Sequence, residues 1–199
     1  MAQNTKASPW DERYAQSEYV YGKQPNEFFK EQLQSLSAGK ILLPAEGEGR
    51  NAVFAAQQGW DVTAFDSSIE GQNKAQALAH EKGVLLNYRI SSFENFDTEE
   101  TYDAIGLVYA HTSNRVNSHA RIIKFLKKGG TLILEGFSKE QLNNNSGGPK
   151  NNDMLFSVDE LKSDFESFSK LDIWTEVIDL SEGSLHSGKA SVIRMVGVK

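Results

Sequence analysis

The stretch that decides the fold is Lys40-Ile41-Leu42-Leu43-Pro44-Ala45-Glu46-Gly47-Glu48-Gly49-Arg50-Asn51. It begins with an apolar run of strand length, continues into a glycine-rich turn and leads into helix-forming residues. Glycine suits such a turn because the backbone must bend sharply and let a ligand approach without a β-carbon in the way. The helix that follows presents free N–H groups and a partial positive charge. The turn is therefore a candidate site for the carboxylate or phosphate of a cofactor.

Strand-like and helix-like stretches alternate along the rest of the chain, which predicts a doubly wound α/β sheet. Strands are expected at residues 40–44, 61–65, 85–90, 103–109, 131–137, 170–180 and 189–198. Helices are expected at 51–56, 69–82 and 118–127, and a further helix begins at a Ser157–Glu160 capping box. The loop 181–188 is too short for a helical crossover, so the last two strands should form an antiparallel hairpin. This predicts one domain over 1–199, with an N-terminal helical flap (1–38) before an α/β core (39–199).

Composition excludes several classes of site and partner. The 199 residues carry a net charge of −6, which counts against a nucleic-acid partner. With no cysteine and no metal-type pair among four histidines, we expect no disulfide, no cysteine nucleophile and no metal site. No apolar run approaches the ~20 residues that span a bilayer, and no signal-peptide core is visible. We expect no membrane segment and a cytoplasmic location, and the sequence does not determine the oligomeric state.

Asp66 ends the second expected strand, nineteen residues after Gly47. In nucleotide-binding sheets a carboxylate at this distance accepts hydrogen bonds from the ribose hydroxyls. We therefore predict a ribose site at Asp66, with Ser67 beside it. The alternative is that Asp66 only caps the helix that starts near Ser68.

Two features favour S-adenosylmethionine (SAM) over a nicotinamide dinucleotide. Glu46 and Glu48 flank Gly47, and an acid there suits the cationic ammonium of SAM better than a diphosphate. The antiparallel hairpin also departs from the six-stranded parallel order of dinucleotide-binding domains. An NAD(P)-dependent oxidoreductase and a non-catalytic SAM- or nucleotide-binding regulatory module stay open as alternatives.

The chain resembles the class I SAM-dependent methyltransferases, and within them the branch related to the tellurite-resistance methyltransferase TehB and the thiol methyltransferases. The resemblance covers nearly the whole chain. It rests on the motifs WDERY (10–14), YVYG (19–22), GEGRNAV (47–53), VTAFD (62–66), YDAI (102–105) and LKKGGTLILE (126–135). The first motif departs from the family pattern, because the residues Leu43-Pro44-Ala45-Glu46-Gly47 stand where the family has Asp-Leu-Gly-Cys-Gly. Glu46 is therefore expected to supply the acidic charge from a shifted position.

The resemblance implies a Rossmann-like, seven-stranded sheet with SAM lying across the carboxyl ends of its first strands. It also implies methyl transfer to a small molecule, with a thiol or other chalcogen compound as the candidate acceptor. By position it assigns Gly47 and Gly49 to the methionyl part of SAM and Ser92 and Phe93 to its adenine. Val108 and Tyr109 are assigned to the floor of the cofactor site, near the methionine. The predicted cofactor-binding residues are Glu46, Gly47, Gly49, Asp66, Ser67, Ser92, Phe93, Val108, Tyr109, Tyr14 and Tyr21.

Two histidines are candidates for the chemistry. His111 follows the fourth strand, and an unperturbed pKa of ~6.5 suits a general base, although a structural histidine is an equal alternative. His186 lies between the last two strands and is expected to be an exposed turn residue.

The aromatic segment 10–29 is expected to close over the cofactor as a flap, with Tyr14 and Tyr21 near the sulfonium. The alternative is a helix packed on the sheet edge through Phe28, Phe29 and Leu33. The pair Lys127-Lys128 is expected to be a solvated helix end.

Overall fold

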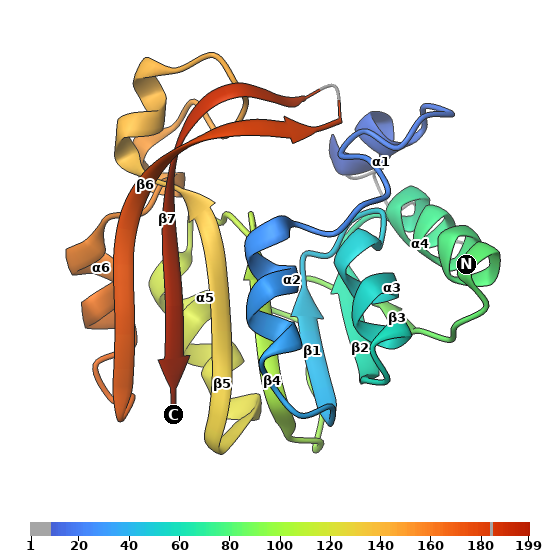
Figure 1. Cartoon of the computed structure of the whole chain (residues 1–199), viewed down its shortest axis with the longest axis horizontal. Helices are drawn as coiled ribbons and strands as arrows, with labels where there is room; N and C mark the ends of the chain where they lie inside the picture. Colours follow the sequence, from blue (N-terminus) through green and yellow to red (C-terminus); the bar gives the residue numbers. More distant parts are fainter. Residues whose placement is uncertain (1–8, 184) are drawn as a thin grey trace, which may run out of the picture.

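The computed structural model describes residues 9–183 and 185–199. A seven-stranded sheet of order β3-β2-β1-β4-β5-β7-β6 forms its centre (Figure 1). The strands are β1 (Lys40–Pro44), β2 (Asp61–Asp66), β3 (Asn87–Ile90), β4 (Tyr102–Val108), β5 (Leu126–Phe137), β6 (Lys170–Glu182) and β7 (His186–Val198). The first five strands run parallel, and β7 is antiparallel to both β5 and β6. The predicted fold, including its terminal hairpin, is confirmed.

Helices cover both faces of this sheet. They are α1 (Pro9–Tyr14), α2 (Glu27–Gln34), α3 (Arg50–Gln57), α4 (Ile69–Lys82), α5 (Arg115–Ile122) and α6 (Val158–Asp164), with 3₁₀ turns at Ile123–Phe125, Lys139–Asn143 and Asn152–Met154. Successive strand side chains point to opposite faces, so Ile41 and Leu43 pack with α2 and α3, whereas Leu42 packs in the cluster that includes α5 and α6. The apolar run of β1 is thus buried on both faces, as expected for a parallel strand.

The helix after β4 differs from the prediction. It begins at Arg115 rather than Ser118, takes Asn114 as its N-cap, and ends at Ile122. Leu126 belongs to β5, where it pairs with Tyr102. The helical spacing of Ile122, Ile123 and Leu126 was misleading, because the last of these is buried as a strand residue.

The interpretation of Lys127-Lys128 as a helix end is therefore wrong. Both residues lie in β5, and the ammonium of Lys127 is 2.7 Å from Asp103 Oδ1. By contrast, the Ser157–Glu160 capping box is present as predicted at the start of α6.

The N-terminal segment divides into two structures. Phe28, Phe29 and Leu33 of α2 are buried in the same cluster as Leu43, so α2 belongs to the core and covers the middle of one sheet face rather than its edge. Residues 9–26 lie instead beyond the carboxyl ends of the strands. Residues 1–8 of the predicted flap are outside the described part of the chain.

The β6–β7 hairpin is long enough to leave the plane of the sheet. Its tip arches across the carboxyl ends of the strands toward α1 (Figure 1). Arg50 at the start of α3 forms an ion pair with Glu182 near this tip, with 2.9 Å between Nη2 and Oε2. The hairpin and the N-terminal segment therefore meet above the glycine-rich turn. Within the described residues, no helix is long and apolar enough to cross a membrane.

Candidate active site

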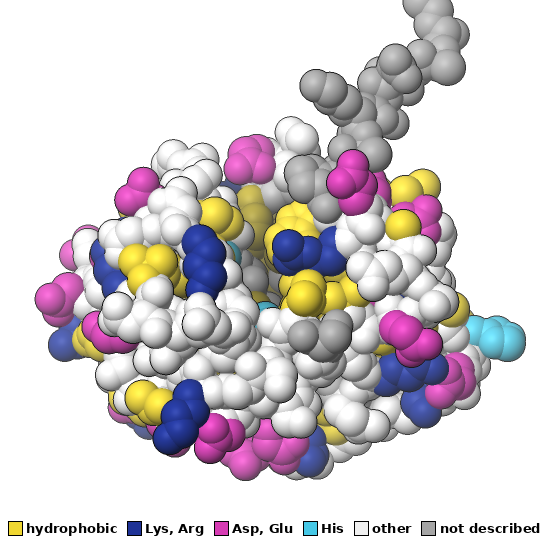
Figure 2. Space-filling model, turned by 90° about the horizontal axis from the view of Figure 1, so that it is seen from above, with side chains coloured by type: hydrophobic (Ala, Val, Ile, Leu, Met, Phe, Trp, Pro, Cys, Tyr) yellow, Lys and Arg dark blue, Asp and Glu magenta, His cyan; other side chains and the backbone are white. Residues whose placement is uncertain are grey.

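A cavity of about 810 Å³ opens at the carboxyl ends of β1, β2 and β4. Figure 2 shows the hollow from above, with hydrophobic side chains inside it and Lys or Arg atoms at its rim. Eleven of the twelve predicted site residues line it; these are Tyr14, Tyr21, Glu46, Gly47, Asp66, Ser67, Ser92, Phe93, Val108, Tyr109 and His111. The residues predicted from the sequence therefore lie around one cavity. The role of each residue depends on its own contacts.

Gly47 sits at the centre of the glycine-rich turn. Its N–H donates to Asp66 Oδ2 at 3.1 Å, and its carbonyl accepts from the Tyr88 hydroxyl at 2.6 Å. A β-carbon on Gly47 would lie 2.6 Å from the Tyr14 hydroxyl oxygen, so only glycine fits beneath that ring.

Gly49 is the one predicted residue that does not line the cavity. It precedes α3 as its N-cap, and a β-carbon there would lie 2.5 Å from the β-carbon of Ala75 in α4. Its position serves the packing of α3 against α4, so the prediction of a cofactor contact by Gly49 is not supported by the geometry.

Asp66 ends β2 beside the glycine-rich turn and is only 7% exposed. Its Oδ1 accepts from the Ser68 N–H at 2.9 Å, while Oδ2 accepts from Gly47. Burial raises its pKa, although the bonds from Ser68 and Gly47 oppose that rise. The side-chain cap of α4 is Ser68, whose hydroxyl accepts from the Gly71 N–H. Asp66 is therefore not the side-chain cap of this helix.

Glu46 is directed to the start of α3 rather than to open space. Its Oε1 accepts from the Ala52 N–H at 2.7 Å, so the chain's own carboxyl fills the anion site predicted at this helix N-terminus. Burial raises its pKa to about 7, against the opposing effects of the Ala52 hydrogen bond and the Arg50 charge. The expectation that Glu46 supplies charge from a shifted position is thus revised: it caps the helix while lining the cavity.

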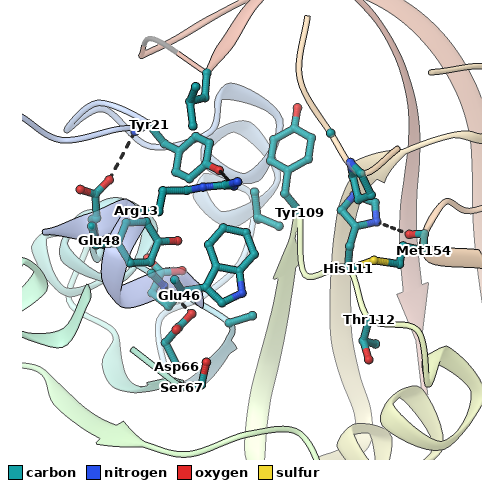
Figure 3. A pocket seen from close by; sticks show the side chains of 18 of the residues that line it. Arg13, Tyr21, Glu46, Glu48, Asp66, Ser67, Tyr109, His111, Thr112 and Met154 are labelled. Atoms are coloured by element: carbon teal, nitrogen blue, oxygen red, sulfur yellow. Dashed lines mark hydrogen bonds between the residues drawn. The ribbon is translucent and has the colours of Figure 1, made fainter. Parts of the chain in front are cut away.

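Glu48 fastens the N-terminal segment to the turn. Its carboxylate accepts from the N–H groups of Val20 and Tyr21, at 3.2 and 3.3 Å, and pairs with the Lys74 ammonium at 2.8 Å. This contact holds Tyr21 over the cavity, as Figure 3 shows.

The aromatic rings of the N-terminal segment form part of the cavity wall. Tyr14 is 5% exposed, stacks on Trp10 and meets Tyr21 edge to face. Arg13 donates to the Tyr21 hydroxyl at 3.0 Å. Tyr14 and Tyr21 both line the cavity, and their contact with a cofactor stays a prediction.

Tyr109 lies at the end of β4 in the left-handed region, with φ of 50°. Its hydroxyl donates to Glu135 Oε1 at 2.9 Å, and Glu135 is fully buried. Asn26 and Arg194 bind the same carboxylate. The strained backbone and this network fix the Tyr109 ring as a wall of the cavity.

His111 is hydrogen-bonded at both of its ring nitrogens, which favours a structural role over that of a general base. Its Nδ1 donates to the Met154 carbonyl at 2.6 Å, and its Nε2 accepts from the Phe137 N–H at 3.0 Å. Burial lowers its pKa to about 4. With both ring nitrogens occupied, it has no lone pair for a substrate proton. In Figure 3 its hydrogen bond to Met154 lies at the end of the cavity opposite Glu46 and Asp66.

His186 is the residue that sequence reasoning misjudged. It is only 5% exposed and lines the cavity, instead of lying in an exposed turn. The predicted strands stopped at 180 and restarted at 189, whereas β6 and β7 extend to Glu182 and back from His186. The residues near the tip of the hairpin, Ser181 to Gly188, are mostly polar, so no apolar alternation indicated that the strands continue there.

Comparison with known proteins agrees with this geometry. Residues 41–130 match the family model of a methyltransferase domain. A similar curated protein is a ubiquinone biosynthesis O-methyltransferase of Rickettsia conorii, 30% identical over 113 residues, which are 56% of this chain and 39% of that protein. The chain thus spans about two fifths of that relative's length.

Solved structures extend this likeness to the segments that flank residues 41–130. TehB from Haemophilus influenzae superposes with a TM-score of 0.70 at 15% identity, over 96% of this chain and 65% of that chain. An S-adenosylmethionine-dependent methyltransferase from Clostridium acetobutylicum superposes with a TM-score of 0.62 at 14% identity, over 86% and 89% of the two chains. These likenesses show that the predicted class I methyltransferase fold is correct.

Proposed function

We propose that this chain binds SAM in the 810 Å³ cavity and transfers its methyl group to a small molecule. The observation that carries the proposal is Asp66 beside Gly47. A carboxylate can accept about four hydrogen bonds, and Asp66 accepts from the backbone N–H groups of Gly47, Ser67 and Ser68. Acceptor capacity is therefore left for a ribose hydroxyl.

Other residues of the cavity suit the other parts of SAM. We assign Ser92 and the buried Phe93, which line the cavity beyond the end of β3, to the adenine. The Tyr14, Tyr21 and Tyr109 rings offer faces to a sulfonium, which aromatic rings attract.

The methionyl carboxylate needs a partner other than the α3 N-terminus, because Glu46 already accepts the Ala52 N–H there. We assign this role to Arg13. Its guanidinium lies over the Trp10 ring and donates to a phenol, but within the described residues it has no carboxylate partner. Arg13 of the N-terminal segment would therefore supply the positive charge for this carboxylate in place of the α3 N-terminus.

SAM supplies a methyl group on an already activated leaving group. The protein's task is to hold the acceptor in line with it and to exclude water, and positioning of this kind can contribute ~7–11 kcal/mol. A thiol or other chalcogen acceptor, which the family resemblance favours, is readily ionised and makes little demand on a general base. The similarity to the Rickettsia ubiquinone biosynthesis O-methyltransferase instead favours an oxygen acceptor.

Calorimetric titration with SAM, S-adenosylhomocysteine and NAD tests the cofactor directly. We expect binding of the first two and none of NAD; the reverse order would support an oxidoreductase. A regulatory module would bind SAM but leave a panel of thiols, phenols and amines unmethylated. Transfer to any member above the rate without protein supports the enzyme.

A further inference from the structure

The end of the cavity away from Asp66 holds a histidine with an unused hydrogen-bonding atom. His186 Nδ1 lies 3.4 Å from Glu182 Oε2, whereas Nε2 bonds to no described residue. Nε2 is also not sealed inside the protein, because the only fully enclosed and unpartnered side-chain atoms among the described residues are the hydroxyls of Tyr102 and Ser118. Nε2 of a buried histidine is therefore open to the cavity.

Glu182 fixes which nitrogen carries the proton. Burial acts to raise its pKa, but the hydrogen bond from His186 and the charge of Arg50 outweigh burial and lower that pKa to about 2. The ionised carboxylate accepts the Nδ1 proton of the neutral ring, which leaves the lone pair on Nε2. A carboxylate that orients an imidazole in this way is the usual support of a histidine base.

Aromatic rings surround this histidine. The ring centroids of Tyr21, Tyr109 and Phe137 lie 4.5, 4.6 and 5.2 Å from that of His186. Met154 and Leu185 add apolar surface to the same end of the cavity. Such walls suit the flat, apolar body of an aromatic acceptor.

The loop that contains Gly147 and Gly148 closes this end of the cavity. A β-carbon on Gly147 would lie 2.9 Å from His186 Cδ2 and 2.4 Å from the Leu185 carbonyl oxygen. The loop therefore lies directly on the histidine, and glycine is required for that approach.

Acidic residues are unevenly distributed in the cavity lining. Glu46, Glu48, Asp66 and Glu94 line it together with Arg13 and Arg50, whereas the described lining residues from Val108 onward include Lys150 but no Asp or Glu. Beside His186 the carboxylate of Glu182 is already paired with Arg50, so a cationic amine acceptor would find no unpaired carboxylate at this end of the cavity. An acceptor that is neutral, or becomes an anion, is favoured there.

From these observations we propose that the acceptor is a small aromatic molecule with a phenolic hydroxyl, and that His186 is its general base, oriented by Glu182. A phenol ionises near pH ~10, within reach of an imidazole base, whereas an aliphatic hydroxyl resembles water at ~15.7. As the oxygen–methyl bond forms and the carbon–sulfur bond breaks, the phenolic proton passes to Nε2. The products are an aryl methyl ether and S-adenosylhomocysteine, and the imidazolium then releases its proton to water.

The inference rests on the proposed SAM-dependent function, so the test first confirms that wild-type protein and each variant bind S-adenosylhomocysteine. Three aromatic probes of similar size are then compared with SAM: catechol, benzenethiol and benzylamine. We expect methylation of catechol, and a loss of at least ~100-fold in its turnover in His186→Gln. Turnover of benzenethiol should change far less, because a thiolate needs no base. His80→Gln, on the exposed face of α4, is the matched control and should behave like wild type.

A readout apart from activity is the ¹⁵N spectrum of the imidazole nitrogens. Catechol added to the S-adenosylhomocysteine complex should shift the Nε2 resonance that disappears in His186→Gln, and Glu182→Gln should alter the tautomer reported by that ring. Intact cofactor binding without a catechol-dependent shift would overturn the inference and leave the proposed function standing. An equal loss with catechol and benzenethiol in His186→Gln would also overturn it, because His186 would then be only a wall. Absence of cofactor binding in wild type would instead refute the proposed function itself.

Discussion

The carboxyl group of Glu46 lies 2.7 Å from the backbone nitrogen of Ala52, so a residue of the altered first motif caps the helix that the motif introduces. This relationship explains why the helix N-terminus is not free for a cofactor carboxylate. It also places a titratable group in a buried position where its protonation affects folding.

We predict that Glu46 makes stability depend on pH between about 4.5 and 7. Its pKa is raised from 4.5 to about 7 in the folded protein, so its contribution is fully present below pH 4.5 and is lost as the pH rises through 7. Glu46→Gln should remove this component, on the order of 3 kcal/mol. The measurement is urea unfolding of both proteins from pH 4.5 to 8; parallel pH profiles would contradict the assignment.

His111 should produce the opposite trend. Its pKa is lowered from 6.5 to about 4, so its contribution is present above pH 6.5 and is lost as the pH falls toward 4. In His111→Gln the amide can replace both hydrogen bonds without titrating. We expect the variant to fold and to lose less stability than wild type between pH 6.5 and 4.5 in thermal unfolding. Loss of methyl transfer in a well-folded variant that binds SAM would show that His111 does more than support the structure.

Ala45 occupies the position where the family has glycine and has φ of 52°. A β-carbon in this region costs roughly 1–2 kcal/mol. Glycine removes this strain, but its larger loss of conformational entropy on folding offsets part of the gain. Ala45→Gly should therefore raise the free energy of unfolding by about 0.5–1 kcal/mol. Ala56→Gly within α3 is the control, and it should lower stability by roughly 1 kcal/mol. The same sign for both changes would show that Ala45 is not strained.

Arg13 is predicted to bind the carboxylate of SAM. Arg13→Ala should weaken SAM affinity by ~10–100-fold, because a hydrogen bond to a charged group contributes about 1.5–3 kcal/mol. Lys82→Ala, an exposed lysine at the end of α4, should leave the affinity unchanged. Calorimetry decides the point, and an Arg13→Ala affinity equal to that of wild type would require another partner for the carboxylate.

The sequence predicted the sheet and the location of the cavity because both depend on local patterns. The apolar run before Gly47, the acid at Asp66 and the short hairpin loop each constrain the chain within a few residues. The role of His111 could not be predicted, since it depends on Met154 and Phe137, which are distant in sequence. His186 was misjudged because the arch of the hairpin is a tertiary feature.

The account depends most on Asp66 as the ribose-binding carboxylate. Calorimetric titration of SAM into wild type, Asp66→Ala and the surface control Asp61→Ala tests this claim most directly. We expect binding in wild type and Asp61→Ala, and an affinity lower by about 1–3 kcal/mol, or roughly 5–150-fold, in folded Asp66→Ala. Equal affinities in all three proteins, or no binding by the wild type, would contradict it.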